Sequence, residues 1–192
     1  HHLFERGVAP AIFGIMFPEF PVFRPLLARG KEVIREHLEN DFFPTGGYDE
    51  HSLSYTCSTT LSEFLLPVKL LAEMNGMEDE ARQWEEKLRR TYSFYSGLVL
   101  PDGKFPDIGD NGGGSARTFL ENGRQYYRSE AAQAVLDALG MRGAGREAPQ
   151  TSALPPLTIH DPLAGYFCTR SGWTTDSHCM VMCNKEFTRY CS

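Results

Sequence analysis

Long apolar runs, basic clusters and paired cysteines are all missing from this 192-residue sequence. No stretch reaches the roughly 18 uninterrupted apolar residues of a membrane span. With 19 Lys and Arg against 25 Asp and Glu, the net charge is −6 and no window is basic, which argues against broad nucleic-acid binding. The five cysteines are an odd number and include no C-x-x-C pair, so they predict neither a disulfide framework nor a zinc ribbon. A content of 41% hydrophobic and 23% charged residues is typical of a globular protein.

Several short signatures are missing as well. The sequence has no phosphate-binding P-loop, no H-E-x-x-H, no G-x-S-x-G and no EF-hand loop. It opens at His1 without a methionine or a signal peptide, and it stops within a strand-like pattern, so we expect a fragment. His178, Cys179 and Cys183 suggest a metal site, but the alternation in HCMVMCN favours a strand, and we expect no metal here.

Apolar residues recur at three- and four-residue spacing over most of the first 140 positions, which predicts helices. We expect helices at about 3–17, 25–40, 52–74, from 78 onward, and at about 129–139. The first is apolar over most of its faces and should be packed on several sides. The third should end in a left-handed cap at Asn75 and Gly76. Stretches rich in Pro and Gly at 44–50 and 100–117 predict loops.

The C-terminal part has a different pattern. Residues 165–173 and 177–187 are strand-like, and residues 140–156 are typical of a linker. Helices followed by strands indicate two layers or two domains. We therefore divide the chain into a helical part at 1–145, a linker at 146–162 and a strand-bearing part at 163–192, and the helical hairpins favour a bundle or a toroid.

Three sets of residues could carry chemistry. His2 and Glu5 share one face at the head of a helix, where a carboxylate can orient an imidazole; a solvated helix end is the alternative. His51, Ser52 and Tyr55 follow a glycine turn, and Ser52 and Tyr55 would face one cleft. A tyrosine can serve as a general acid at neutral pH, although packing on its own helix is the alternative for Tyr55.

The third set consists of acids in the loop at 100–117. Asp102, Asp107 and Asp110 lie within nine residues of each other. Paired carboxylates are what glycoside hydrolysis requires. Asp side chains also cap turns, and this structural role is the alternative.

The landmarks HHLFERG, GIMFPEF, GGYDEHSLSY, LPDGKFPDIGDN and GYFCTRSGW stand in an order that resembles the heparinase II/III-like polysaccharide lyases and the related oligo-alginate lyases. The resemblance covers nearly the whole chain. It implies a mainly α fold, an incomplete (α/α) toroid of helical hairpins, followed by the first strands of an antiparallel β-sandwich domain.

The resemblance also implies residue roles. Glu50, Ser52 and Tyr55 match the E-x-S-x-x-Y segment that carries the catalytic tyrosine of the family. His2 matches the histidine of an Asn-His pair, and Glu5 would hold its ring. The second catalytic histidine of the family belongs to the sandwich and would follow Ser192.

The implied reaction is β-elimination of a glycan next to a uronic acid. Tyr55 would protonate the leaving oxygen and, in a syn geometry, would also act as the base. His2 would neutralise the carboxylate or act as a base on the opposite face. His51, Arg117, Arg124 and the loop residues Asp110 and Asn111 would bind substrate, with Arg128 as a further source of positive charge. The substrate would be a heparan-, hyaluronan- or alginate-like polymer.

Cofactors and location follow from the same resemblance. No cofactor is expected in this segment, and the resemblance allows a structural metal in the β-domain beyond it. The partner would be an anionic polysaccharide or oligosaccharide, without nucleic acid or a membrane span, in the periplasm or outside a bacterial cell. The alternatives are a toroidal glycoside hydrolase using the loop aspartates, and a glycan-binding or inactive module.

Overall fold

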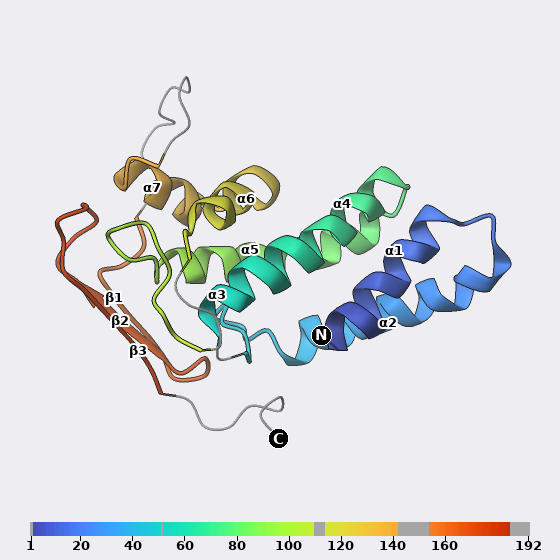
Figure 1. The fold of residues 1–192 in the computed structure, drawn as a ribbon, viewed down its shortest axis with the longest axis horizontal. Coiled ribbons are helices and arrows are strands. Elements are labelled where there is room, and N and C mark those ends of the chain that lie inside the picture. The colour runs from blue at the N-terminus through green and yellow to red at the C-terminus, as the bar shows by residue number, and fades with distance from the viewer. Residues whose placement is uncertain (1, 51, 110–113, 142–153, 185–192) are drawn as a thin grey trace.

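The computed structural model describes residues 2–50, 52–109, 114–141 and 154–184, and Figure 1 shows their arrangement. Helices fill the larger part of the molecule, and a small antiparallel sheet lies at the C-terminal side. The elements are η1 (Phe4–Val8), α1 (Ala9–Met16), η2 (Pro21–Phe23), α2 (Arg24–Asn40), α3 (Leu53–Tyr55), η3 (Thr56–Leu65), α4 (Leu66–Met74), α5 (Glu78–Ser96), α6 (Arg117–Tyr127), α7 (Glu130–Ala138), β1 (Thr158–Asp161), β2 (Tyr166–Arg170) and β3 (Cys179–Cys183).

The first hairpin is formed by η1 and α1, with α2 returning against them (Figure 1). Two glycines allow the close approach of the two helices. A Cβ on Gly30 would lie 2.6 Å from the Ala11 nitrogen, and a Cβ on Gly14 would lie 2.3 Å from Leu27 Cβ. The predicted helices at 3–17 and 25–40 are therefore present and packed as a pair.

The expectation that the first helix is packed on several sides is wrong at its end. Phe13 and Met16 are about half exposed, and Phe20 in the following turn is equally open. The rings of Phe13 and Phe23 lie 6.0 Å apart, and those of Phe20 and Phe23 also lie 6.0 Å apart. The aromatic residues of this turn thus contact each other rather than a neighbouring helix.

The second hairpin consists of one long helical stretch and α5. The stretch at 53–74 runs through α3, η3 and α4 without a break, as the apolar spacing predicted. Its middle part is π-helical, and Ser62 donates a hydrogen bond to the Cys57 carbonyl five residues earlier, at 2.8 Å. Gly76, with φ +75°, follows the end of α4, which confirms the predicted cap. Acidic residues then open α5 at Glu78.

Helices α6 and α7 complete the helical part. Helix α7 lies where a short helix was predicted, and the Ser129 hydroxyl accepts a hydrogen bond from the Ala132 nitrogen as its cap. The sequence did not predict α6. Its apolar residues Phe119 and Tyr127 bury themselves on Tyr92 of α5, with ring centroids 4.5 and 4.7 Å from it.

The sheet has the order β1-β2-β3, and both neighbouring pairs are antiparallel. Strand β1 lies inside the stretch that the sequence assigned to a linker, while β2 and β3 lie in the predicted strand segments. Arg170 of β2 joins the sheet to the end of α5, since its guanidinium donates to the Val99 carbonyl at 3.0 Å and the Gly97 carbonyl at 2.6 Å.

This architecture confirms the predicted fold class, a mainly helical chain of hairpins followed by antiparallel strands. Over the described ranges, every helix is too short or too polar to cross a membrane. Within the described ranges, no group of three or more His, Cys, Asp or Glu side chains is placed to hold a metal ion.

Candidate active site

The site begins at the glycine turn that precedes α3. Gly46 has φ +101°, and a Cβ there would lie 2.5 Å from the Arg90 carbonyl oxygen of α5. A Cβ on Gly47 would lie 2.2 Å from Ala164 Cβ, close to the sheet. Both positions therefore exclude a side chain, and the turn is wedged between α5 and the segment that joins β1 to β2.

The turn is also fixed by hydrogen bonds. The Tyr48 nitrogen donates to the Tyr95 hydroxyl at 3.1 Å, and the Phe43 nitrogen donates to the Gly47 carbonyl at 2.8 Å. The Asp49 nitrogen donates to the Asp41 carbonyl, also at 2.8 Å. The path of the chain into α3 is thus determined by buried contacts.

Tyr55 lies in the first turn of the helix that follows. It is half-buried, whereas the helical tyrosines Tyr92, Tyr95 and Tyr127 are fully buried in the core. Partial burial raises the pKa of the Tyr55 phenol, and the nearby carboxylates of Glu50 and Glu63 raise it further. The phenol is consequently accessible and protonated at neutral pH, the state that a proton donor needs.

The expectation that Ser52 faces the same cleft as Tyr55 is wrong. Ser52 is only 1% exposed, and its hydroxyl is buried without a hydrogen-bond partner in the described structure. Its carbonyl accepts hydrogen bonds from the Thr56 nitrogen at 2.9 Å and the Thr56 hydroxyl at 2.8 Å. Ser52 and Tyr55 are three residues apart, and on a regular helix this spacing places them on neighbouring faces. Ser52 lies at the start of the helix, however, and is buried in the interior.

The loop after α5 reaches the start of α3. The Ile108 carbonyl accepts a hydrogen bond from the Leu53 nitrogen at 3.2 Å, which places this part of the loop beside the turn that holds Tyr55. Asp102 caps a turn, because its carboxylate accepts from the Lys104 nitrogen at 3.1 Å. Asp107 is exposed. The predicted substrate-binding residues His51, Asp110 and Asn111 lie outside the described residues.

His2 and Glu5 are both exposed at the start of the first helix. Within the described residues, no hydrogen bond or ion pair joins them. The predicted pairing assumed the 3.6-residue period of an α-helix. Glu5, however, belongs to the π-helical segment η1, which has more residues in each turn. Two residues that are three positions apart therefore lie on different faces. Glu5 therefore does not hold the His2 ring in this structure.

The first helix and the helix of Tyr55 run parallel to each other, η1 beside η3 and α1 beside α4 (Figure 1). The Phe4 and Phe64 rings meet with centroids 4.9 Å apart. Tyr55 lies nine residues before Phe64, whereas His2 lies only two residues before Phe4, so the Tyr55 turn extends beyond His2 along the parallel helices.

The two predicted binding arginines of α6 have different surroundings. Arg117 forms an ion pair with Glu121, with 3.1 Å between Nε and Oε1. Arg124 lies two turns further along and is partly buried, and no ion pair involves it in the described part of the chain. Helix α6 contacts η3, so both arginines lie on the helix that neighbours the one bearing Tyr55.

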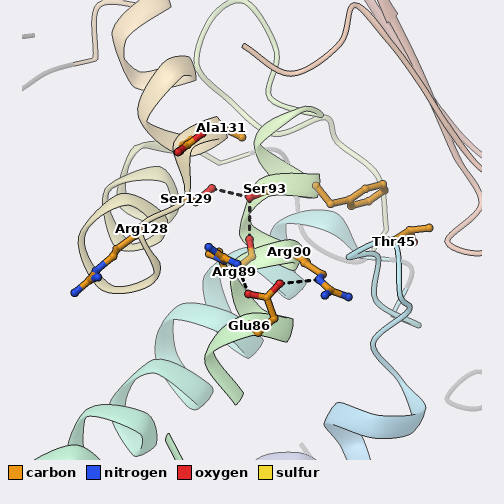
Figure 2. Close-up of a pocket in the computed structure, with 10 residues that line it drawn as sticks. Thr45, Glu86, Arg89, Arg90, Ser93, Arg128, Ser129 and Ala131 are labelled. Atoms are coloured by element: carbon orange, nitrogen blue, oxygen red, sulfur yellow. Dashed lines mark hydrogen bonds and ion pairs between the residues drawn. The ribbon is translucent and has the colours of Figure 1, made fainter. Parts of the chain in front are cut away.

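A second group of arginines was not predicted. Arg89 and Arg90 of α5 and Arg128 after α6 line a hollow of about 550 Å³, shown in Figure 2. Arg128 had been expected to serve the cleft together with Arg117 and Arg124, but neither of these two lines the hollow. In the sequence, the adjacent arginines at 89 and 90 were the available signal for this group. Arg128 comes near them only because α5 packs against the turn before α7.

The solved structures that resemble this chain include heparinases. A heparinase III structure superimposes with a TM-score of 0.72 at 21% identity, covering 93% of this chain and 28% of that chain. A mutant heparan sulfate lyase from Pedobacter heparinus gives a TM-score of 0.66 at 22% identity, covering 95% and 28%. These likenesses define the fold as that of a heparinase helical region with its adjoining strands.

The sequence comparisons lead to the family. Residues 1–135 match the family described as Heparinase II/III N-terminus, and the chain therefore belongs to it. A heparin-sulfate lyase of Bacteroides thetaiotaomicron is 25% identical over 194 aligned positions, which cover 96% of this chain and 27% of that protein. The chain thus spans about a quarter of the length of the relatives it matches.

Proposed function

We propose that this chain forms part of a polysaccharide lyase that cleaves uronate-containing glycans by β-elimination, with Tyr55 as the proton donor. The observation that carries the proposal is the environment of Tyr55: a half-exposed phenol at a helix start, in a chain of the heparinase II/III family whose other helical core tyrosines are buried. The relatives named as heparin-sulfate and heparan sulfate lyases support an anionic polysaccharide as the substrate.

The raised pKa of Tyr55 favours the role of acid over that of base. A base must first lose its own proton, and the carboxylates of Glu50 and Glu63 oppose a negative phenolate. An acid needs the proton, which these groups help to retain. Tyr55 is therefore the group that protonates the departing glycosidic oxygen on C4, and the C5 proton leaves to a different group.

His2 is the proposed group on the other side of the sugar. His2 is exposed at the helix start and the Tyr55 turn lies further along the parallel helices, so we place the sugar ring between the two side chains. A neutral imidazole there can accept the C5 proton, and a protonated one can neutralise the uronate carboxylate. His51, Asp110, Asn111, Arg117 and Arg124 remain proposed substrate contacts, with the periplasm or the exterior of a bacterial cell as the proposed location.

A glycoside hydrolase is the less favoured function. Asp102 is committed to a turn, which removes one of the three loop acids from the candidates. Asp107 is exposed to solvent, and Asp110 lies outside the described residues. The two functions are distinguished by their products, because elimination leaves a conjugated double bond that absorbs ultraviolet light and hydrolysis does not.

The test is Tyr55→Phe in the protein that carries this chain, with heparan-, hyaluronan- and alginate-type oligosaccharides as substrates. Loss of a general acid should lower the rate of ultraviolet-absorbing product by about 10²- to 10⁴-fold. Tyr126→Phe is the matched control, since Tyr126 is also a half-buried helical tyrosine and its replacement should leave the rate unchanged. Full turnover in Tyr55→Phe, or new reducing ends without absorbance, would refute the proposal.

A further inference from the structure

The hollow in Figure 2 lies between α5, the turn that joins α6 to α7, and the loop before α3. Its charged lining consists of Arg89, Arg90, Arg128, Glu86 and Glu130. Thr45, Ser93 and Ser129 also line the hollow, and the Ser93 and Ser129 hydroxyls hydrogen-bond to each other at 2.9 Å. A hollow of about 550 Å³ is large enough for one or two sugar units.

The lining is positive in a chain whose net charge is −6. The lining contains three arginines and two glutamates, which leaves an excess of one positive charge. Glu86 is shared, because one of its oxygens pairs with Arg90 Nε at 3.0 Å while the other pairs with Arg89. A guanidinium carries five N–H donors, so a single shared carboxylate leaves donors of both arginines available.

Arg128 has an unusual backbone. It is the one residue other than glycine with positive φ in the described ranges, at 52°, and it follows the last residue of α6. Glycine or asparagine is the usual residue at such a left-handed cap, because a Cβ is unfavourable there. The Arg128 side chain is exposed and has no ion pair among the described residues, so the fold gains nothing visible from an arginine at this strained position.

We propose that this hollow is a second glycan-binding site, in which Arg89, Arg90 and Arg128, whose guanidinium groups point to different sides of the hollow (Figure 2), bind separate sulfate or carboxylate groups along the acidic polysaccharide. The planar guanidinium matches both anions with two parallel hydrogen bonds. The proposal relies on the proposed function for the class of ligand. Tyr55 and His2 do not line the hollow, so the site anchors the polymer away from the reacting sugar, where a second contact raises the effective concentration of the chain at the first.

The experiment measures binding by isothermal titration calorimetry in the protein that carries this chain, with Tyr55→Phe throughout so that no probe is cleaved. The probes are a heparin-derived tetrasaccharide, a non-sulfated uronate tetrasaccharide and inorganic sulfate. Comparing the first two shows whether sulfate or carboxylate supplies the anion. Arg89→Gln is paired with Arg82→Gln, because each arginine belongs to α5 and forms an ion pair with an acid three residues earlier, but only Arg89 lines the hollow.

Arg89→Gln should weaken tetrasaccharide binding by about five- to tenfold, and Arg82→Gln should not change it. Arg128→Gly should weaken binding to a similar degree while its melting temperature stays equal or rises, since glycine relieves the strained cap. A purely structural role of Arg128 would instead lower the melting temperature and leave the affinity of the folded protein unchanged. This outcome, or equal binding by the Arg89 and Arg82 variants, overturns the proposal.

Glu86→Gln offers a test by gain of affinity. Arg89 and Arg90 lower the pKa of Glu86, so this carboxylate is ionised at neutral pH and competes with an incoming anion. The glutamine of Glu86→Gln carries no charge, so it releases both guanidinium groups from their ion pairs. Tetrasaccharide binding should become tighter by about threefold or more, and the gain should be smaller at high salt. An unchanged affinity in Glu86→Gln would contradict the assignment of these arginines to the ligand. Absence of elimination together with these binding changes would refute the proposed function and leave the second site in place.

Discussion

Arg170 is the residue whose replacement tests most directly what joins the sheet to the helices. Its side chain is buried, with only 6% of the residue exposed, and its guanidinium donates to the carbonyl oxygens of Gly97 and Val99 at 2.6 and 3.0 Å. The same group lies over the Trp173 ring, 3.7 Å from its centroid. Arg170 thus connects β2 to the two carbonyls just after α5, where the helix has unsatisfied acceptors.

The expected cost of losing this group follows from those contacts. Two hydrogen bonds from a charged donor contribute about 1.5 kcal/mol each, and the buried ring contact contributes about 1 to 2 kcal/mol. The freed side chain recovers about 2 kcal/mol of conformational entropy when it is no longer ordered. We therefore expect Arg170→Ala to lower the free energy of unfolding by about 2 to 3 kcal/mol.

Two further substitutions separate the causes. Arg170→Lys keeps the charge, but a single ammonium cannot reach both carbonyls, so about half of the loss should remain. Arg170→Met removes the charge and its desolvation cost while leaving the Gly97 and Val99 carbonyls without their donor, and we expect a loss of about 2 kcal/mol.

Urea unfolding followed by circular dichroism measures these differences, with Arg82→Ala as an exposed control that should change stability by less than about 0.5 kcal/mol. A Met variant as stable as the parent would show that the buried charge costs as much as its hydrogen bonds contribute. That result would refute the view that Arg170 stabilises the junction.

Two other predictions concern the core. Gly46→Ala should lower the free energy of unfolding by about 2 to 4 kcal/mol in the same assay, because φ is +101° and the new Cβ would lie 2.5 Å from the Arg90 carbonyl; an unchanged midpoint would contradict this. Burial raises the pKa values of Tyr95 and Tyr127 well above 10, so the folded state holds these protons more tightly than the unfolded state. The resulting stability is complete below about pH 10 and is lost above it, and ultraviolet difference spectra should show these tyrosinates forming only as the protein unfolds.

The helices that the sequence predicted well are those whose apolar spacing is regular. The stretch at 53–74 and the start of helix α5 were placed within a residue or two, because the buried positions follow one stripe and the boundary between the two helices carries strong signals such as Gly76. The π-helical middle of the first stretch was not predicted. Its extra residue per turn changes the spacing only locally, and side-chain hydrogen bonds such as that of Ser62 accompany it.

Helix α6 and strand β1 were missed for a different reason. Both depend on contacts with distant segments. Gly123 weakens the helical signal of α6, yet a Cβ at this position would lie 2.8 Å from the Tyr92 ring, so the glycine is required for packing rather than for a turn. Strand β1 has only four residues and little alternation of apolar and polar side chains. It forms because it pairs with β2, in a register that begins with Thr158 opposite Thr169.

The candidate site shows the same division between local and distant causes. The position of Tyr55 near a helix start could be predicted, because a glycine turn followed by a regular helix is a local pattern. The direction of Ser52 could not, and neither could the separation of His2 from Glu5, since both depend on how the helix begins and on its local period.

What orients Tyr55 is the meeting of three segments far apart in the sequence. The turn before α3 is held by Tyr95 of α5 through the Tyr48 nitrogen, and it contacts Ala164 between β1 and β2. The loop after α5 supplies the Ile108 carbonyl to the first nitrogen of α3. The sheet is therefore part of the framework that positions the phenol, and a change at Ala164 that displaces the turn would act on Tyr55 without touching it.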